Sequence, residues 1–349
     1  MRMDKKVSVI IPCYNIEKYI DRCLQSLEQQ SMPMEEIEII LVDDNSTDGT
    51  WGRLQAYEEK YPESVMIIHN DVNIRQGAIR NMALDYASAG YIAFIDGDDW
   101  ISRDYLSKLY DKAVEYDCDL VMCNAYRDFG DGRRIEIKKT ELSVSRFICI
   151  DTPEKRKNII VNETVGSTAW AKLIRKNYLI ENEIYFPEGI FFEDIPWGAL
   201  NNICVSRMYI TNEFLYHYFI NENSVVLKKD QTYYRDMLEA NYYKWSEIER
   251  RNVRKDMPLE LEFDFIVNYY LAALNMFAHH YTEIPPEVFE EMQQFVMDRF
   301  PQYQTNPYIK NNLGEKHQMQ IYFLDKKMGK EELRQLHGIL SGSGLQDRC

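Results

Sequence analysis

The sequence predicts an α/β fold with a mostly parallel sheet flanked by helices, followed by an α-helical C-terminal extension. Strand and helix patterns alternate at short intervals through the first hundred residues, which is typical of a parallel sheet with right-handed crossovers. The predicted strands are continuous apolar, β-branched runs, as expected for strands covered on both faces. From about residue 230 the pattern changes to long helical periodicity that is dense in aromatic residues.

The hydrophobic pattern places each element of the first part in turn. We expect buried strands at Val7–Ile11, Ile37–Val42, Val65–His69 and Tyr91–Ile95. Helices are predicted between and after them at Ile16–Gln30, Thr50–Tyr61, Gly77–Ala89 and Tyr105–Tyr116. A further strand follows at Asp119–Ala125, and residues 127–150 are expected to form a hairpin or a lid.

A chain of 349 residues is too long for one ordinary core, so we predict two parts. Residues 1–228 form the α/β domain, and residues 229–349 form a helical region that serves packing, dimerisation, or contact with an acceptor or a membrane. Its helices are expected at Tyr233–Glu249, Leu259–Tyr281 and Pro286–Phe300.

Composition narrows the class of protein. A formal net charge of −15 argues against a nucleic-acid partner, because no excess of Lys and Arg exists to neutralise phosphates. The seven cysteines are scattered without a CxxC pair, which favours reduced thiols in a cytoplasmic protein. No apolar run reaches the length of a membrane span or of a secretion signal. Peripheral contact with the inner face of a membrane, through lysines after residue 309, is left open.

An acidic cluster, Asp96-Gly97-Asp98-Asp99, directly follows the apolar run Tyr91–Ile95. Three carboxylates so close together repel one another unless a cation lies among them. A divalent cation that is also bound by phosphate oxygens or water is the usual solution. The alternative is a polar turn that caps the next helix.

Three other polar segments also follow predicted strands: Pro12-Cys13-Tyr14-Asn15, Asp43–Gly49 and Asn73–Asn81. Because the carboxyl ends of parallel strands meet at one sheet edge, we expect these loops and the acidic cluster to converge on one ligand. Asp44 can accept a hydrogen bond from the imide N–H of a uracil base. Its alternative role is in a tight turn that caps the following helix.

These segments together resemble the family 2 glycosyltransferases. The resemblance rests on Val7–Asn15, Val42–Gly49, Gly77–Asn81 and Phe94–Asp99, and on the later strings Trp170–Leu173, Phe186–Gly189 and Glu193-Asp194. It covers about residues 5–226. The sequence after Tyr218 departs from the family, which often has arginines where this chain reads Phe219–Ser224.

The resemblance implies a GT-A (Rossmann-like) fold, a nucleotide-diphosphate sugar as donor, a divalent metal ion (Mn²⁺ or Mg²⁺), and inversion at the anomeric carbon. Carried over by position, the pocket for the base and ribose would include Pro12, Tyr14, Asn15 and Asp44. Asp96 would lie near the ribose or the metal, and Asp98 would be the main metal ligand with Asp99 beside it. Arg80 would lie close to the nucleotide, with Arg75 competing for that role. Asp194 would be the general base, with Glu193 as its rival.

The chemistry of such a transfer needs two separate carboxylate sites. One carboxylate deprotonates the acceptor hydroxyl, and another binds the cation that stabilises the leaving diphosphate. The Glu193-Asp194 pair also fits the acidic N-terminal turn of a helix with Pro196 in its first turn, and both roles are compatible.

Two further side chains and two other functions remain as alternatives. His217 either completes a metal site or is packed and hydrogen-bonded among aromatics, and the second is favoured. Trp170 either stacks on a sugar or belongs to the core of an apolar helix. A nucleotide-sugar-binding scaffold without catalysis is the main alternative function. A nucleotidyltransferase is disfavoured, because the first loop lacks the Gly-rich, basic sequence that binds a triphosphate.

Overall fold

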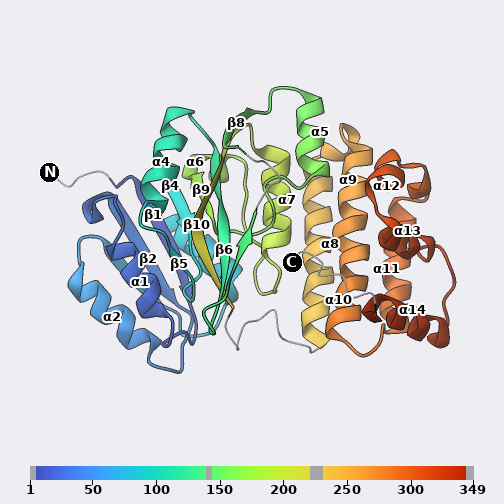
Figure 1. Cartoon of the computed structure of the whole chain (residues 1–349), viewed down its shortest axis with the longest axis horizontal. Coiled ribbons are helices and arrows are strands. Elements are labelled where there is room, and N and C mark those ends of the chain that lie inside the picture. Colours follow the sequence, from blue (N-terminus) through green and yellow to red (C-terminus); the bar gives the residue numbers. More distant parts are fainter. Residues whose placement is uncertain (1–4, 139–143, 221–230, 343–349) are drawn as a thin grey trace. The chain divides into compact units, whose positions relative to one another are not determined.

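The computed structural model describes residues 5–138, 144–220 and 231–342. Within them the chain forms two compact units, which Figure 1 colours from blue to yellow-green and from yellow to red. The first unit takes the described residues up to 220 except residues 160–162, which group with the second unit at 231–342. The predicted boundary at residue 228 lies outside the described residues.

The first unit is built on a ten-stranded mixed sheet in the order β3-β2-β1-β4-β9-β6-β10-β5, with β7 on β6 and β8 on β10. The strands are β1 (Val7–Cys13), β2 (Ile37–Asp43), β3 (Val65–His69), β4 (Tyr91–Phe94), β5 (Trp100–Ile101), β6 (Leu120–Phe129), β7 (Arg134–Ile137), β8 (Arg146–Cys149), β9 (Lys172–Arg175) and β10 (Arg207–Ile220). The pairs β1–β2, β2–β3, β1–β4 and β6–β10 are parallel. Strand β9 is antiparallel to both β4 and β6, so the sheet is parallel at one side and mixed beyond it. The predicted α/β class is confirmed.

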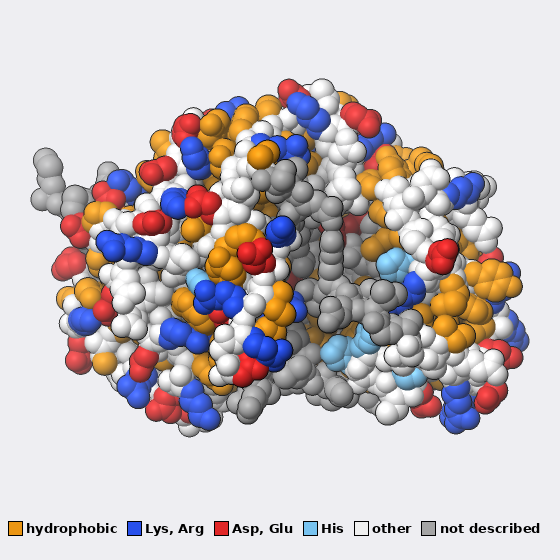
Figure 2. All heavy atoms as spheres, in the orientation of Figure 1, with side chains coloured by type: hydrophobic (Ala, Val, Ile, Leu, Met, Phe, Trp, Pro, Cys, Tyr) orange, Lys and Arg blue, Asp and Glu red, His pale blue; other side chains and the backbone are white. Residues whose placement is uncertain are grey.

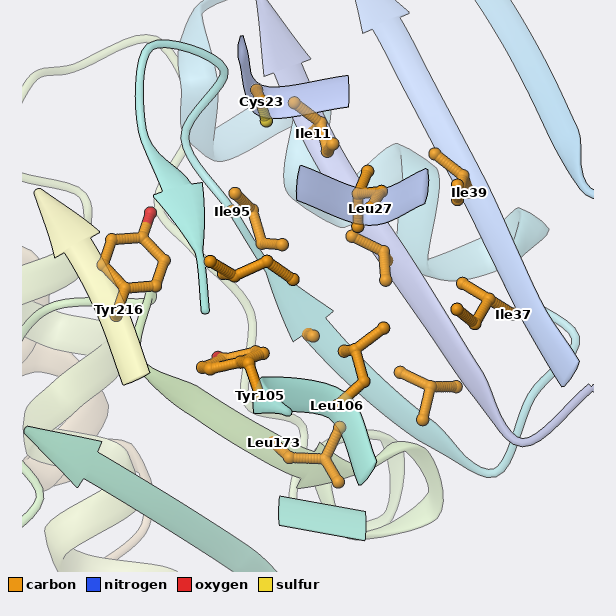
Figure 3. Close-up of a cluster of buried hydrophobic side chains, with 14 of the residues drawn as sticks. Ile11, Cys23, Leu27, Ile37, Ile39, Ile95, Tyr105, Leu106, Leu173 and Tyr216 are labelled. Atoms are coloured by element: carbon orange, nitrogen blue, oxygen red, sulfur yellow. The ribbon is translucent and has the colours of Figure 1, made fainter. Parts of the chain in front are cut away.

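Helices cover both faces of this sheet, as the unbroken apolar strands predict. The elements are α1 (Ile20–Glu28), α2 (Thr50–Lys60), α3 (Arg75–Tyr86), α4 (Tyr105–Glu115), α5 (Pro153–Val161), α6 (Lys176–Glu181) and α7 (Asp194–Cys204). Side chains of α1, α2 and α4 share one core cluster with alternate strand residues such as Ile11 and Ile39. Figure 3 shows part of this cluster, with side chains of α1 and α4 packed on the strands. Intervening residues such as Ile10 and Ile40 pack with α3, α6 and α7 on the opposite face.

Two predicted elements differ in detail. The first helix begins at Ile20 instead of Ile16, because the preceding loop is tied to residues 46–50 by side-chain hydrogen bonds. Trp170 lies in the turn before β9 and not in a helix. The predicted hairpin after residue 127 is formed by β6 and β7, and residues 139–143 lie outside the described part.

The second unit is helical, as predicted from its periodicity. It contains α8 (Gln231–Arg250), α9 (Pro258–Phe265), a π-helical segment (Ile266–Leu271), α10 (Ala272–His280), α11 (Pro286–Arg299), α12 (Pro307–Asn312), α13 (Glu315–Tyr322) and α14 (Lys330–Gly342). The aromatic residues pack inside it, with the Trp245 ring 5.2 Å from Phe265 and 5.0 Å from Phe300. Near them the fully buried Lys244 ammonium lies 2.9 Å from Asp264.

Charged side chains of both signs lie on the surface of the described residues (Figure 2). Figure 2 shows acidic and basic side chains interspersed over the coloured part of the visible face. None of the helices in the described ranges combines the length and apolar character needed to cross a bilayer.

Candidate active site

The acidic cluster forms a tight turn between β4 and β5. The amide of Asp99 donates to the Asp96 carbonyl at 3.0 Å and closes the turn. Gly97 packs closely at its tip, since a Cβ there would lie 2.3 Å from Ile16 Cδ1 and 3.2 Å from the Pro12 carbonyl oxygen. The turn therefore packs directly on the end of β1, which brings two of the predicted motifs together.

Strand β10 holds this turn through Tyr216 and Phe219. The Tyr216 hydroxyl accepts from the Asp96 amide at 3.2 Å and donates to Asp99 Oδ2 at 2.7 Å. The Phe219 amide donates to Asp99 Oδ1 at 2.7 Å. Burial and the neighbouring carboxylates raise the pKa of Asp99, while these two donors act in the opposite direction. Asp99 is fully buried, so its carboxylate anchors the turn to β10.

Arg22 of α1 holds the same turn from the other side. Its Nη2 donates to the Asp98 carbonyl at 2.9 Å. The guanidinium carbon lies 3.8 Å from the centre of the Trp100 ring and 4.2 Å from that of Phe219. Arginine stacked on aromatic rings is well suited to a fixed, partly buried position. With its peptide fixed in this way, Asp98 keeps a partly exposed side chain at the tip of the turn.

Arg80 of α3 connects the acidic turn to Glu193, the residue before the predicted base Asp194. Its Nη2 lies 2.8 Å from Asp96 Oδ1, and its Nη1 lies 2.5 Å from Glu193 Oε1. Only 3% of Arg80 is exposed, and the two carboxylates raise the pKa of the guanidinium against the effect of burial. Asp96, Arg80 and Glu193 therefore form one ion-pair chain, in which Arg80 and Glu193 are buried and Asp96 is partly exposed.

Glu193 and Asp194 lie at the start of α7, as predicted, but in different surroundings. Glu193 is buried against Arg80, whereas Asp194 is the first residue of the helix and is partly exposed. Burial and the charges of Glu193 and Asp96 raise the pKa of Asp194 to about 6, and Arg80 and Lys172 act against this rise. A carboxyl with this pKa is ionised at neutral pH and is a stronger base than an ordinary aspartate.

Asp44 caps helix α3. Its Oδ1 accepts from the Ile74 amide and its Oδ2 from the Arg75 amide, each at 2.9 Å, and Asn70 Nδ2 donates to Oδ1 at 2.9 Å. Only 1% of Asp44 is exposed. The carboxylate thus caps α3, the second helix after it, rather than α2, the next one. A contact between Asp44 and a uracil base stays a prediction.

The other predicted donor-binding residues lie around the end of β1. Pro12 is buried in the strand, and Tyr14 is 49% exposed. Asn15 has a φ of 52° and connects this loop to the next, because its Oδ1 accepts from the Thr47 amide at 2.8 Å. The Arg75 guanidinium stacks on the Phe191 ring at 4.4 Å, between α3 and the segment before α7.

The residues present fit a cation that is shared with a diphosphate. Within residues 5–138, 144–220 and 231–342, no group of three or more His, Cys, Asp or Glu side chains is arranged to hold a metal ion by itself. Mg²⁺ is usually bound through one or two carboxylates with phosphates and water completing its shell. Asp98, partly exposed at this turn, is suited to such a ligand set. The Asp96 carboxylate accepts from Arg80, and both Asp99 oxygens accept from Tyr216 and Phe219.

Three residues around the site, His217, Arg22 and Tyr216, were not among the site residues predicted from the sequence. His217 is packed and hydrogen-bonded, as favoured, since its Nδ1 lies 3.0 Å from Asp128 and its Nε2 lies 3.2 Å from Ser102. Arg22 and Tyr216 were not predicted, because their partners lie 76 and 117 residues away along the chain. The aromatic run from Tyr216 to Phe219 was the available signal. The family often has arginines in the segment that reads Phe219–Ser224 here, and the part of it after Ile220 lies outside the described residues.

Comparison with known proteins identifies the family of this chain. A model of the family described as Glycosyl transferase family 2 matches residues 8–182. The poly(ribitol-phosphate) beta-glucosyltransferase of Bacillus spizizenii is 31% identical over 74% of this chain, and the putative glycosyltransferase EpsH of Bacillus subtilis is 28% identical over 77%. The alignments span 40% and 76% of those proteins, respectively.

Among solved structures, S. aureus TarS 1-349 in complex with UDP-GlcNAc aligns with 97% of this chain and 91% of its own, with a TM-score of 0.69 and 20% identity. This similarity supports the GT-A fold. The matched family model covers half of the chain and all four strand-end motifs, so the chain belongs to glycosyl transferase family 2.

Proposed function

We propose that this chain is an inverting glycosyltransferase. It transfers a sugar from a nucleotide-diphosphate sugar, of the UDP type, to a hydroxyl group of a glycan or lipid-linked saccharide. The observation that carries the proposal is the position of Asp194 at the first residue of α7, and its raised pKa is compatible with a general base. Asp194 is next to Glu193, which Arg80 joins to the acidic turn containing Asp98.

In the proposed reaction, the acceptor hydroxyl oxygen attacks the anomeric carbon on the face opposite the diphosphate. Asp194 takes the hydroxyl proton as the new carbon–oxygen bond forms. The bond to the diphosphate oxygen breaks and its electron pair leaves with the nucleoside diphosphate, so the configuration inverts. A positioned base of this kind contributes about 10²–10⁴-fold to the rate.

The donor would bind at the sheet edge formed by the ends of β1, β2 and β4. The exposed ring of Tyr14 is available to stack on the base, with Pro12, Asn15 and Asp44 around it. Asp98 would hold Mn²⁺ or Mg²⁺ together with the diphosphate, and the cation would stabilise charge on the leaving group. Asp99 as a second ligand stays a prediction, since both of its oxygens bind protein donors here.

The acceptor is proposed from the relatives. The Bacillus spizizenii relative and S. aureus TarS are both named as poly(ribitol-phosphate) transferases, so a polyol-phosphate polymer belongs first in an acceptor screen.

We also propose a cytoplasmic location at the inner face of the membrane. The contact would be made by Lys310, Lys316, Lys326, Lys327 and Lys330. Absence of binding to anionic liposomes would contradict this location, and binding that survives Lys→Glu changes at these positions would contradict the role of the lysines.

The test begins with thermal shifts against UDP, GDP, dTDP and CMP, each with and without Mn²⁺. We expect UDP with Mn²⁺ to stabilise the protein, and Asp98→Ala to remove the Mn²⁺-dependent part. Donor-dependent UDP release is then measured for Asp194→Asn and for Asp111→Asn, which makes the same chemical change on the exposed face of α4.

We expect Asp194→Asn to keep UDP binding and to lose about 10²-fold or more of the rate, while Asp111→Asn retains it. Binding without turnover in the unmodified protein, across a panel of UDP-sugars and acceptors, would support the scaffold alternative. Full turnover by Asp194→Asn would refute the assigned base.

A further inference from the structure

Arg80 lies where the donor side and the base side of the site meet. Its guanidinium donates to Asp96 at the end of β4, to Glu193 at the start of α7, and to Gln76 Oε1 at 3.0 Å on its own helix. It is 3% exposed and lies 5.3 Å from the Phe186 ring. An arginine so enclosed has little surface available to a ligand. Its position is better explained by the two carboxylates that it holds, Asp96 and Glu193.

Helix α3 is fixed to both sides around Arg80. At its start, Asp44 caps the amides of Ile74 and Arg75. Farther along, Asn81 Nδ2 donates to the Phe186 carbonyl at 2.8 Å, and the Phe186 amide donates back to Asn81 Oδ1 at 2.9 Å. The helix therefore forms a rigid connection between the loop after β2 and the segment that leads to α7.

Gly77 permits the close approach that this connection needs. A Cβ at Gly77 would lie 2.3 Å from the Pro187 carbonyl oxygen and 3.2 Å from the Glu193 Cβ. The backbone of α3 thus lies against the segment that carries the two acids. At this separation, Arg80 reaches Glu193 with one guanidinium nitrogen and Asp96 with the other.

We propose that Arg80 is a positioning residue for the base: it holds Glu193 in a fixed ion pair and so leaves Asp194 as the carboxylate that takes the proton. The same guanidinium ties the start of α7 to Asp96, so that the base keeps a set distance from the donor turn. This inference rests on the proposed function, because it takes Asp194 as the base. It differs from the direct contact between Arg80 and the nucleotide that the family resemblance implied.

The charges around Asp194 make the inference measurable. Glu193 and Asp96 add to burial in raising the pKa of Asp194, whereas Arg80 and Lys172 lower it. Removing the Arg80 charge should therefore raise the pKa of the base, and removing the Glu193 charge should lower it. A neighbouring charge shifts a carboxyl pKa by about one unit or more.

The experiment measures kcat/KM of the full chain over a range of about pH 5 to 9 in the unmodified protein and in Arg80→Gln, Arg80→Lys and Glu193→Gln. Arg53→Gln, at an exposed arginine of α2, is the matched control. The acid limb should move to higher pH in Arg80→Gln and to lower pH in Glu193→Gln. Arg80→Lys keeps the charge but carries it on a single nitrogen, so it cannot reproduce the two contacts that Nη1 and Nη2 make with Glu193 and Asp96. Its limb should therefore stay while kcat falls by about 10-fold to 10²-fold.

Four results decide the matter. Limbs that stay in place in both Arg80→Gln and Glu193→Gln, with only thermal stability reduced, would make Arg80 purely structural and overturn the inference. A large loss of UDP affinity in Arg80→Lys with kcat unchanged would make it a donor contact and also overturn it. If Arg80→Gln does not fold, the inference is tested by the other two variants. It then requires the acid limb to move to lower pH in Glu193→Gln and kcat to fall in Arg80→Lys. Full activity of Asp194→Asn would refute the base itself, which separates failure of the proposed function from failure of this inference.

Discussion

At the scale of the residue, Asp194 carries a cost in stability that its proposed role explains. The folded protein raises the pKa of Asp194 from 3.8 to about 6, so it holds this proton more tightly than the unfolded chain does. The contribution of this group to stability is therefore greatest below pH 4 and is lost as the pH rises through 6. Groups used in catalysis commonly have such a cost.

Asn at position 194 cannot ionise. The stability of Asp194→Asn against urea, measured relative to the unmodified protein at the same pH, should therefore be higher at pH 8 than at pH 4. The measurement is the denaturant midpoint of both proteins at each pH, with Asp111→Asn on α4 as the control. An equal difference between the proteins at both pH values would contradict the raised pKa.

Tyr216 provides a second prediction at this scale. Its hydroxyl bonds both the Asp96 amide and the buried Asp99 carboxylate, so Tyr216→Phe leaves a buried acceptor short of one donor. The expected loss is about 1–3 kcal/mol in the free energy of unfolding. Tyr218→Phe, two residues along the same strand and partly exposed, is the control. Equal losses in the two variants would mean that the hydroxyl of Tyr216 has no special role.

At the scale of the element, α3 gives the sharpest test of packing. Gly77→Ala places a methyl group against the Pro187 carbonyl, so the helix or the facing segment must move. Overpacking of this kind costs about 1–3 kcal/mol, and a displaced Glu193 should lower kcat as well. Gly52→Ala in α2 meets nothing within 4 Å and should instead stabilise the helix by about 0.5–1 kcal/mol. Chemical denaturation of both variants, with UDP release, measures these effects.

The elements also show what a sequence can predict. The bounds of β1 to β4 were predicted nearly to the residue, because parallel strands read as unbroken apolar runs. The predicted burial of β3 was wrong, because β3 lies at the sheet edge and Met66 is 38% exposed. Strands β5 and β9 were not predicted, because β5 has only two residues and β9 has only two apolar residues between a lysine and an arginine. The motif residues of the site were found from local strings. The ion-pair chain through Arg80 was not, because it depends on how α3 packs against a segment 113 residues later.

At the scale of the whole molecule, the helical unit has a core of its own with a buried charge pair. Lys244→Met would leave the Asp264 carboxylate buried without its cation, which costs about 3–5 kcal/mol when one partner is removed. Hydrogen exchange should show the largest loss of protection in α8 and α9. The double change Lys244→Met with Asp264→Leu should restore most of that protection, and failure to do so would show that the pair is not the cause.

Strand β10 has a consequence for how the protein is made. It pairs with β5 more than a hundred residues earlier in the chain and supplies the donors that hold Asp99. A nascent chain on the ribosome can assemble β1 to β4 well before this strand has been synthesised. Until β10 emerges, three carboxylates at the end of β4 lack the Tyr216 hydroxyl and the Phe219 amide. The donor site is therefore completed late in translation, and chains that terminate before residue 220 will display an unanchored acidic loop rather than a working pocket.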